Sequence, residues 1–303
     1  MAPQLTRRSF LATGAALCAS AWTAPIARAA GAPAVCVFSK HFQHLDYAQL
    51  AATGRQVGLD GIDLTVREGG HVLPENVAEN LPKAVEALRA QGLSVPMITT
   101  NLKSGKDPDA ETILMAASEQ GIGHFRIGGH KYSGEGDPIA EAEGFAQDLR
   151  SLAELAGQYN MTAGYHNHSG SNNFGAPLWD LLRVLDEIDS PHLGSNFDVG
   201  HATVEGPYGD WPITARALAP RVKMLAVKDF EFERGRPRWC TLGEGMVDLS
   251  GFFAIFREHG FAGPVSIHFE NSEFNRADDA SKVEQLAEAV KRVRRELRKA
   301  GYE

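Results

Sequence analysis

Several short stretches of the sequence combine histidine with carboxylate residues. In Tyr165-His166-Asn167-His168 two imidazoles lie two residues apart, so they share one face if the segment is a β-strand. Imidazole and carboxylate groups are common ligands of Mn, Fe, Co and Zn, which act as Lewis acids on carbonyl or hydroxyl oxygens. The metal ligands that we expect are His166, Asp198, His268 and Glu270. The alternative is a hydrogen-bonded network that binds sugar hydroxyls without a metal.

The same residue types can also transfer protons. A histidine or a glutamate can take a proton from carbon, and a nearby cation can stabilise the enolate that forms. The expected catalytic residues are His166, Lys228 and Glu270. For Lys228 the alternative is a pair with Asp229 that only orders the loop. The residues expected to contact substrate are Lys40, His41, Arg67, His71, His168 and His201.

The elements that must position these side chains recur along the chain. Short apolar, β-branched runs alternate with stretches of helical periodicity, which predicts parallel βα units. The runs cover residues 34–38, 61–66, 95–100, 124–128, 162–166, 193–198, 222–227 and 265–269. Eight such units in about 270 residues predict a closed (β/α)₈ TIM barrel, in one domain over residues 30–303. A doubly wound open sheet is disfavoured, because no Gly-x-Gly-x-x-Gly follows the first run.

Helix boundaries carry their own signals. Asp107-Pro108 and Asp137-Pro138 predict helix starts, with aspartate at the cap and proline in the first turn. Glycine followed by an apolar residue predicts helix ends at Gly58, Gly92, Gly121 and Gly260.

Polar residues follow most of the predicted strands. Six of the 11 histidines lie within a few residues of a strand's carboxyl end, where the active sites of such barrels are found. We therefore expect them to converge on one ionisable pocket at the barrel mouth.

The first 29 residues predict an export signal. Arg7-Arg8-Ser9-Phe10-Leu11 resembles a twin-arginine motif, and an apolar run and Ala27-Arg28-Ala29 follow it. A short membrane anchor is the alternative. We expect cleavage after Ala29, passage through the twin-arginine machinery and a periplasmic or secreted location, with no membrane association after cleavage.

Composition narrows the class of protein. The chain has 303 residues with 30 Lys+Arg against 38 Asp+Glu, a net charge of −8, which argues against nucleic-acid binding. Three cysteines are too few for a disulfide scaffold, and Cys36 lies in an apolar run, which predicts a buried free thiol.

The motifs together resemble the sugar phosphate isomerase/epimerase superfamily, the xylose isomerase-like TIM barrels. They are residues 38–41, 61–67, 165–168, 197–201, 227–229 and 242–245. The resemblance implies metal ligands Glu, Asp, His and Glu at strands five to eight, the two glutamates also serving as an acid/base pair. This chain has His166, Asp198, Ala226 and His268 at those positions, with Glu270 two residues further on.

Three functions remain open at this point. The first is an exported carbohydrate isomerase or epimerase that transfers a proton next to a carbonyl of a free sugar, keto-sugar or polyol, with metal assistance. The second is a lyase or hydrolase that cleaves an oxidised (keto) glycoside in the same pocket. The third is a non-catalytic sugar-binding protein.

Overall fold

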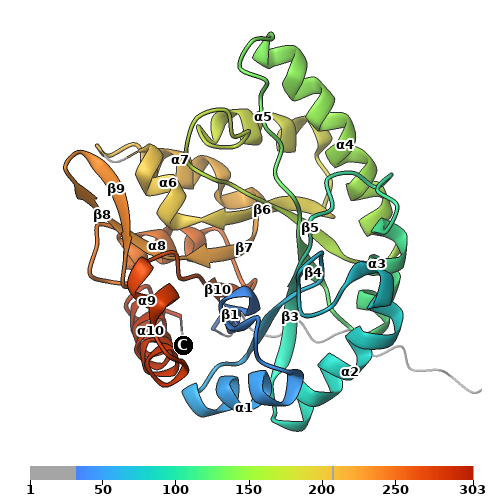
Figure 1. Ribbon diagram of the computed structural model, residues 1–303. Coiled ribbons are helices and arrows are strands. Elements are labelled where there is room, and N and C mark those ends of the chain that lie inside the picture. The colour runs from blue at the N-terminus through green and yellow to red at the C-terminus, as the bar shows by residue number, and fades with distance from the viewer. Residues whose placement is uncertain (1–31, 207, 303) are drawn as a thin grey trace, which may run out of the picture.

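The computed structural model describes residues 32–206 and 208–302, and it shows a closed barrel of eight parallel strands (Figure 1). The strands follow one another around the barrel in the order β1-β10-β7-β6-β5-β4-β3-β2. They are β1 (Val35–Phe38), β2 (Gly61–Thr65), β3 (Ser94–Thr99), β4 (His124–Arg126), β5 (Thr162–His166), β6 (Leu193–Asp198), β7 (Val222–Val227) and β10 (Val265–Ile267). The predicted TIM barrel is confirmed, and its strands lie within two residues of the predicted bounds.

The barrel closes where the first and last strands pair. Val35 of β1 lies opposite Val265 of β10, and Val37 lies opposite Ile62 of β2 on the other side. Both faces of these strands are buried, one against the helices and one inside the barrel, which is why they read as continuous apolar runs.

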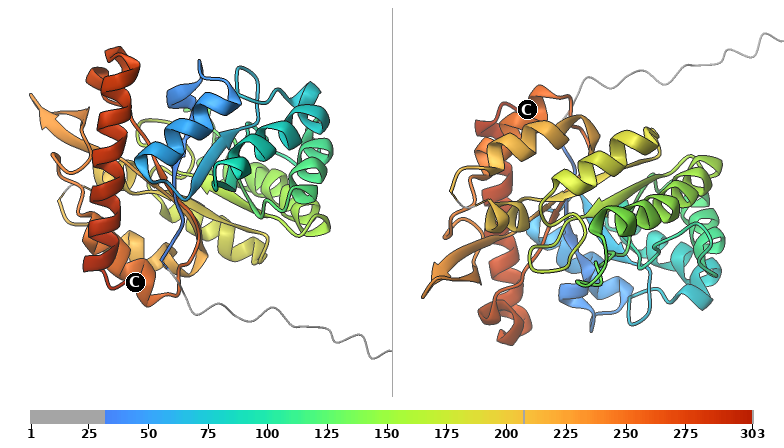
Figure 2. Two further views of the ribbon diagram at one scale, coloured as in Figure 1. Left: turned by 90° about the horizontal axis from the view of Figure 1, so that it is seen from below. Right: turned by 90° about the horizontal axis from the view of Figure 1, so that it is seen from above.

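Helices form the outer layer around the strands (Figure 2). They are α1 (Tyr47–Val57), α2 (Val77–Ala90), α3 (Ala110–Glu119), α4 (Pro138–Gln158), α5 (Trp179–Ile188), α6 (Val199–Glu205), α7 (Trp211–Leu218), α8 (Leu249–Glu258), α9 (Ser272–Arg276) and α10 (Asp279–Lys299). Helix α10 packs beside both α1 and α8, which closes the outer layer. None of the described helices is long and apolar enough to cross a membrane.

Most predicted helix boundaries are confirmed. Asp137 caps α4 by accepting the N–H of Ile139, and all four predicted glycines have positive φ angles of 72° to 78°. The predicted start at Asp107 is wrong, because Asp109 is the N-cap residue of α3. The Asp107 carboxylate instead accepts backbone N–H groups from the preceding loop, at Lys103 and Ser104.

An antiparallel hairpin follows β7 and was not predicted. It consists of β8 (Asp229–Glu233) and β9 (Arg236–Cys240), which project from the side of the barrel (Figure 1). Arg234 and Gly235 have positive φ angles of 51° and 75°, the conformation that two-residue hairpin turns require. The hairpin brings Trp239 toward the barrel mouth, 4.9 Å from the ring of His201.

The cysteine prediction is confirmed, since Cys36 is a buried free thiol. The predicted signal sequence, residues 1–29, lies outside the described residues.

Candidate active site

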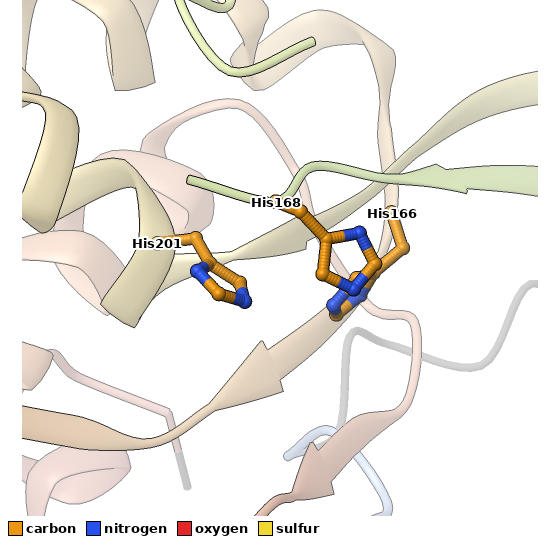
Figure 3. Close-up of side chains that lie close together, drawn as sticks. All are labelled: His166, His168 and His201. Carbon is orange, nitrogen blue, oxygen red and sulfur yellow. The ribbon is translucent and has the colours of Figure 1, made fainter. Parts of the chain in front are cut away.

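Three histidines lie together at the carboxyl ends of β5 and β6 (Figure 3). His166 is the last residue of β5, and His168 lies two residues further on. Their ring centroids are 4.5 Å apart, as the shared strand face predicted. His201 comes from the first turn of α6, and its ring lies 5.0 Å from that of His168. The predicted convergence of these residues is therefore seen in the structure.

Two cations fix the tautomers of these rings. Lys228 Nζ lies 2.6 Å from His201 Nε2, and because an ammonium only donates, Nε2 must be the acceptor. The proton of neutral His201 then resides on Nδ1, which lies 2.7 Å from the Ser169 hydroxyl. Arg126 Nη2 lies 3.4 Å from His168 Nε2, which by the same reasoning carries a lone pair.

The cluster is held in its neutral form. Burial, with Arg126 and Lys228 adding positive potential, lowers the pKa of His168 to about 3 and that of His201 to about 2. The same causes lower the pKa values of His166 and His268 well below the usual range. At neutral pH the mouth thus offers imidazole bases rather than imidazolium acids.

Asp198 is the carboxylate at the centre of the site. It is fully buried, and its Oδ1 accepts the backbone N–H of His201 at 2.8 Å. Its Oδ2 lies 3.4 Å from His166 Nε2 and 3.3 Å from Lys228 Nζ. The side chain of Asn167 bonds both the N–H and the C=O of Asp198, which aligns the ends of β5 and β6.

The side chains of Lys228 and Asp229 lie in different environments, because successive side chains of an extended segment point to opposite faces. Lys228 is 2% exposed, lies 3.6 Å from Glu270 Oε1, and has its Nζ 4.4 Å from the ring centroid of Trp239. Asp229 instead accepts the backbone N–H of Phe230 and those of residues 243, 245 and 247 in the loop that follows β9. The loop-ordering role that the sequence left open therefore belongs to Asp229, while Lys228 faces the site.

The donor chemistry fits a divalent metal. His166, Asp198 and His268 each offer one ligand atom, and these atoms lie within 4.8 Å of one another. Among the described residues, the buried atoms Asp198 Oδ2 and His268 Nε2 make no hydrogen bond, and the nearest cation to Oδ2 is Lys228 Nζ at 3.3 Å. Glu270, the fourth expected ligand, is not part of this group. A second group, His166, His168 and His201, shares His166 with the first.

Two charged residues of the site were not singled out in the sequence. Asp63 on β2 is fully buried, accepts hydrogen bonds from Thr99 and Ser266 at 2.7 Å, and lies 4.0 Å from His268 Nε2. Burial raises its pKa to about 6. Arg126 is the last residue of β4. For Asp63 the signal was a charged residue inside an apolar strand, and for Arg126 it was a charged residue at the carboxyl end of a strand.

The remaining predicted contacts lie around the rim. His41 Nε2 accepts the N–H of Phe269 at 2.9 Å, so His41 supports the end of β10. His71 Nδ1 lies within 3.2 Å of the hydroxyls of both Ser39 and Thr65. The Arg67 guanidinium lies 5.3 Å from the centroid of the Phe38 ring, and the Lys40 side chain is exposed.

Two hollows extend the site beside β4 and β5. One of about 390 Å³ is lined by His168 and Ser169 among others, and one of about 730 Å³ by polar loop residues such as Asn172. Both are lined by Asn173, so they adjoin. Their volumes fall within the range of small-molecule sites.

Comparison with known proteins places the fold in a family. Residues 51–298, from α1 into α10, match the family described as xylose isomerase-like TIM barrel. The chain belongs to this family. The similar proteins named below include a dehydratase and an epimerase.

A 3-dehydroshikimate dehydratase of Pseudomonas aeruginosa is 32% identical over 152 residues, which cover 46% of this chain and 23% of that protein. The chain spans less than half the length of the curated relatives it matches. The solved 3-keto-D-glucoside 4-epimerase of E. coli superposes with a TM-score of 0.66 at 15% identity, covering 86% of this chain and 99% of that chain.

A Mycobacterium smegmatis barrel solved in complex with magnesium superposes with a TM-score of 0.64 at 17% identity, covering 89% of this chain and 97% of that chain. At these identities the two superpositions show the common fold.

Proposed function

We propose that this protein is a lyase acting on a polyhydroxylated ketone. It would remove a proton from the carbon next to the carbonyl and expel a hydroxyl or alkoxyl group from the adjacent carbon. The observation that carries this proposal is the cluster of imidazole rings at the barrel mouth beside the buried side chain of Lys228. The 3-dehydroshikimate dehydratase relative supports elimination as the reaction class.

His168 is the base that the geometry favours. It is the more exposed histidine of the three, its Nε2 carries a lone pair, and the 3.4 Å contact with Arg126 is weak enough to give way to substrate. His166 is buried with its Nε2 toward Asp198, which suits a ligand better than a base. The position of Lys228 suits stabilisation of an enolate oxygen.

The proposed elimination conserves protons and electron pairs at each step. His168 takes the proton, and the electron pair of the C–H bond passes into the enolate beside Lys228. The enolate re-forms the carbonyl as the leaving group departs from the adjacent carbon. The proton returns from His168 to that leaving group, which restores neutral His168, so the net change is loss of water or of an alcohol.

The acid/base positions that the resemblance implied do not hold glutamates in this chain. They hold His166, at the end of β5, and His268, after β10, and these two histidines are also candidate metal ligands. A mechanism with one base on each of these rings would therefore compete with metal binding. Epimerisation is the second candidate, because the Glu270 carboxylate, 3.6 Å from Lys228 Nζ, is a further group at the mouth that could exchange a proton with carbon.

A divalent metal belongs to the proposal as well. His166, Asp198 and His268 would hold Mn, Fe, Co or Zn. When bound, the ion would polarise a carbonyl or hydroxyl oxygen of the substrate as a Lewis acid.

Export through the twin-arginine pathway remains a proposal from the sequence. This proposal rests on Arg7 and Arg8, the arginine pair of the predicted export motif. Replacing both by lysine should leave the protein in the cytoplasm of a twin-arginine-competent host, whereas unchanged fractionation would contradict it.

Incubation with hydroxyketones tests the lyase assignment. The panel contains keto-sugars, keto-glycosides and cyclic hydroxyketones, and products are read by mass. We expect a product lighter by water or an alcohol, and we expect His168→Gln to lower turnover by about 10²-fold or more. His44→Gln, outside the site, is the matched control. A product of equal mass would indicate the epimerase, and no turnover of any member would contradict both.

A further inference from the structure

We propose that the substrate carries a carboxylate, which Arg126 binds with the help of Arg67 at the rim. This inference rests on the proposed function, whose site it shares, and it names the class of substrate: a hydroxyketone that is also an acid.

The first step is that both guanidinium groups lack an ionic partner. Within residues 32–206 and 208–302, no carboxylate lies within 4.0 Å of Arg67 or Arg126, and the side-chain hydrogen bond of Arg126 goes to a neutral ring, His168. Six other arginines of the chain do have carboxylate partners: Arg150, Arg183, Arg221, Arg238, Arg294 and Arg295. The other described arginines without a carboxylate partner are exposed, except Arg292, which donates to the Gly243 carbonyl. Arg67 and Arg126 differ from these exposed arginines because they are half-buried at the mouth.

The second step is that a single ring orients both groups. The guanidinium carbons of Arg67 and Arg126 lie 5.3 and 5.4 Å from the ring centroid of Phe38, within cation–π range. Phe38 itself stacks on His268 at 4.7 Å, which fixes it against the catalytic cluster. The two cations therefore face the same part of the mouth as the proposed metal ligands and His168.

The third step concerns the charge of Arg126 and the free energy that burying this cation costs. Burial lowers the pKa of Arg126 to about 10, with the charge of Asp63 opposing that shift, so Arg126 remains cationic at neutral pH. A partly buried cation without an ion pair is costly, and an anionic ligand would offset that cost. The planar fork of a guanidinium matches the two oxygens of a carboxylate.

A phosphate fits this mouth less well. In barrels of this type phosphate binds to backbone N–H groups in the loops after the last two strands. Here the N–H groups of Gly243 and Gly245, in the loops after β7, are already bonded to the Asp229 carboxylate at 2.7 and 3.0 Å. The inference therefore names a carboxylate rather than a phosphate.

Matched pairs of ligands test the inference by calorimetry. The pairs are D-glucuronate with D-glucose, D-galacturonate with D-galactose, and shikimate with methyl shikimate, and D-glucose 6-phosphate represents phosphates. We expect the wild-type protein to bind at least one acid 10-fold or more tighter than its neutral partner. Arg126→Gln should abolish that preference, Arg126→Lys should weaken it, and Arg183→Gln, a surface arginine, should keep it.

Several results would overturn the inference. Equal binding of acid and neutral partners, preference for the phosphate, or no binding by any member would each do so, as would an unchanged preference in Arg126→Gln. If Arg126→Gln does not fold, Arg67→Gln serves instead, with a smaller loss of preference expected. Because binding is measured without turnover, an acid that binds through Arg126 while no hydroxyketone reacts would refute the proposed lyase alone.

Discussion

At the scale of single residues, hydrogen-bond donors decide what each histidine can do. Lys228 and Arg126 each present N–H groups to an imidazole nitrogen, which leaves His201 and His168 neutral with known tautomers. His166 and His268 face carboxylates instead, at 3.4 and 4.0 Å. The same residue type therefore supplies a base in one pair and candidate metal ligands in the other.

Asp198→Ala should remove the metal site. Elemental analysis of untagged protein, after incubation with each ion and desalting, should find about one Mn, Fe, Co or Zn per chain in the wild type and none in the variant, because Asp198 supplies the anionic ligand. Asp186→Ala, on the surface, should retain the ion. A wild-type protein that binds none of these ions would contradict the proposed metal centre.

At the scale of elements, the segment after β7 is organised by one buried carboxylate. Asp229 lies 1% exposed and accepts four backbone N–H groups, three of them from the loop that follows β9. That loop and the hairpin support Trp239, which packs against His201 and Lys228. The geometry of the lysine thus depends on residues well outside the site.

Asp229→Ala should lower the free energy of unfolding by about 3 kcal/mol, because it leaves buried N–H groups without their charged acceptor. Urea denaturation measures the change. Glu244→Ala lies in the same loop, and its carboxylate has no ion pair with another described residue, so it should change stability by no more than about 0.5 kcal/mol. Equal effects of the two substitutions would contradict the assigned role of Asp229.

At the scale of the whole molecule, the buried histidines make the fold sensitive to acid. Burial lowers the pKa of His41 and His168 to about 3 and of His201 to about 2, whereas the unfolded chain protonates its histidines near pH 6.5. Stability is therefore full above pH 6.5 and is lost as the pH falls toward 3. Asp63, with its pKa raised to about 6, acts in the opposite direction between pH 6 and 4.

His166 and His268, whose pKa values are also lowered, add to these three histidines, so histidine protonation outweighs Asp63 between pH 6 and 4. The free energy of unfolding should fall there by at least about 3 kcal/mol per pH unit, since each uncompensated proton contributes about 1.4 kcal/mol per unit. Urea denaturation at pH 7, 6 and 5 measures this slope. A free energy that is constant or rises at pH 5 would show that these histidines are already protonated in the native state.

The fold was predictable because local signals agree with it. Apolar runs predicted the positions of the strands, and glycines such as Gly58 and Gly260 predicted where helices end. The histidines were also predictable, since the barrel brings strand ends together. Arg126 and Asp63 were missed because one sequence does not show which strand charges point inward. The β8–β9 hairpin was missed because its polar, partly exposed residues lack the apolar signal of a barrel strand.

The tautomers of His168 and His201 test the central claim most directly. Long-range ¹H–¹⁵N spectra of metal-free protein, assigned with His168→Gln and His201→Gln, report protonation at each ring nitrogen. We predict that both rings are neutral at pH 6 and carry their proton on Nδ1, because Arg126 and Lys228 donate to Nε2. A ring that is doubly protonated at pH 6, or that carries its proton on Nε2, would contradict the neutral-base site on which the proposed reaction depends.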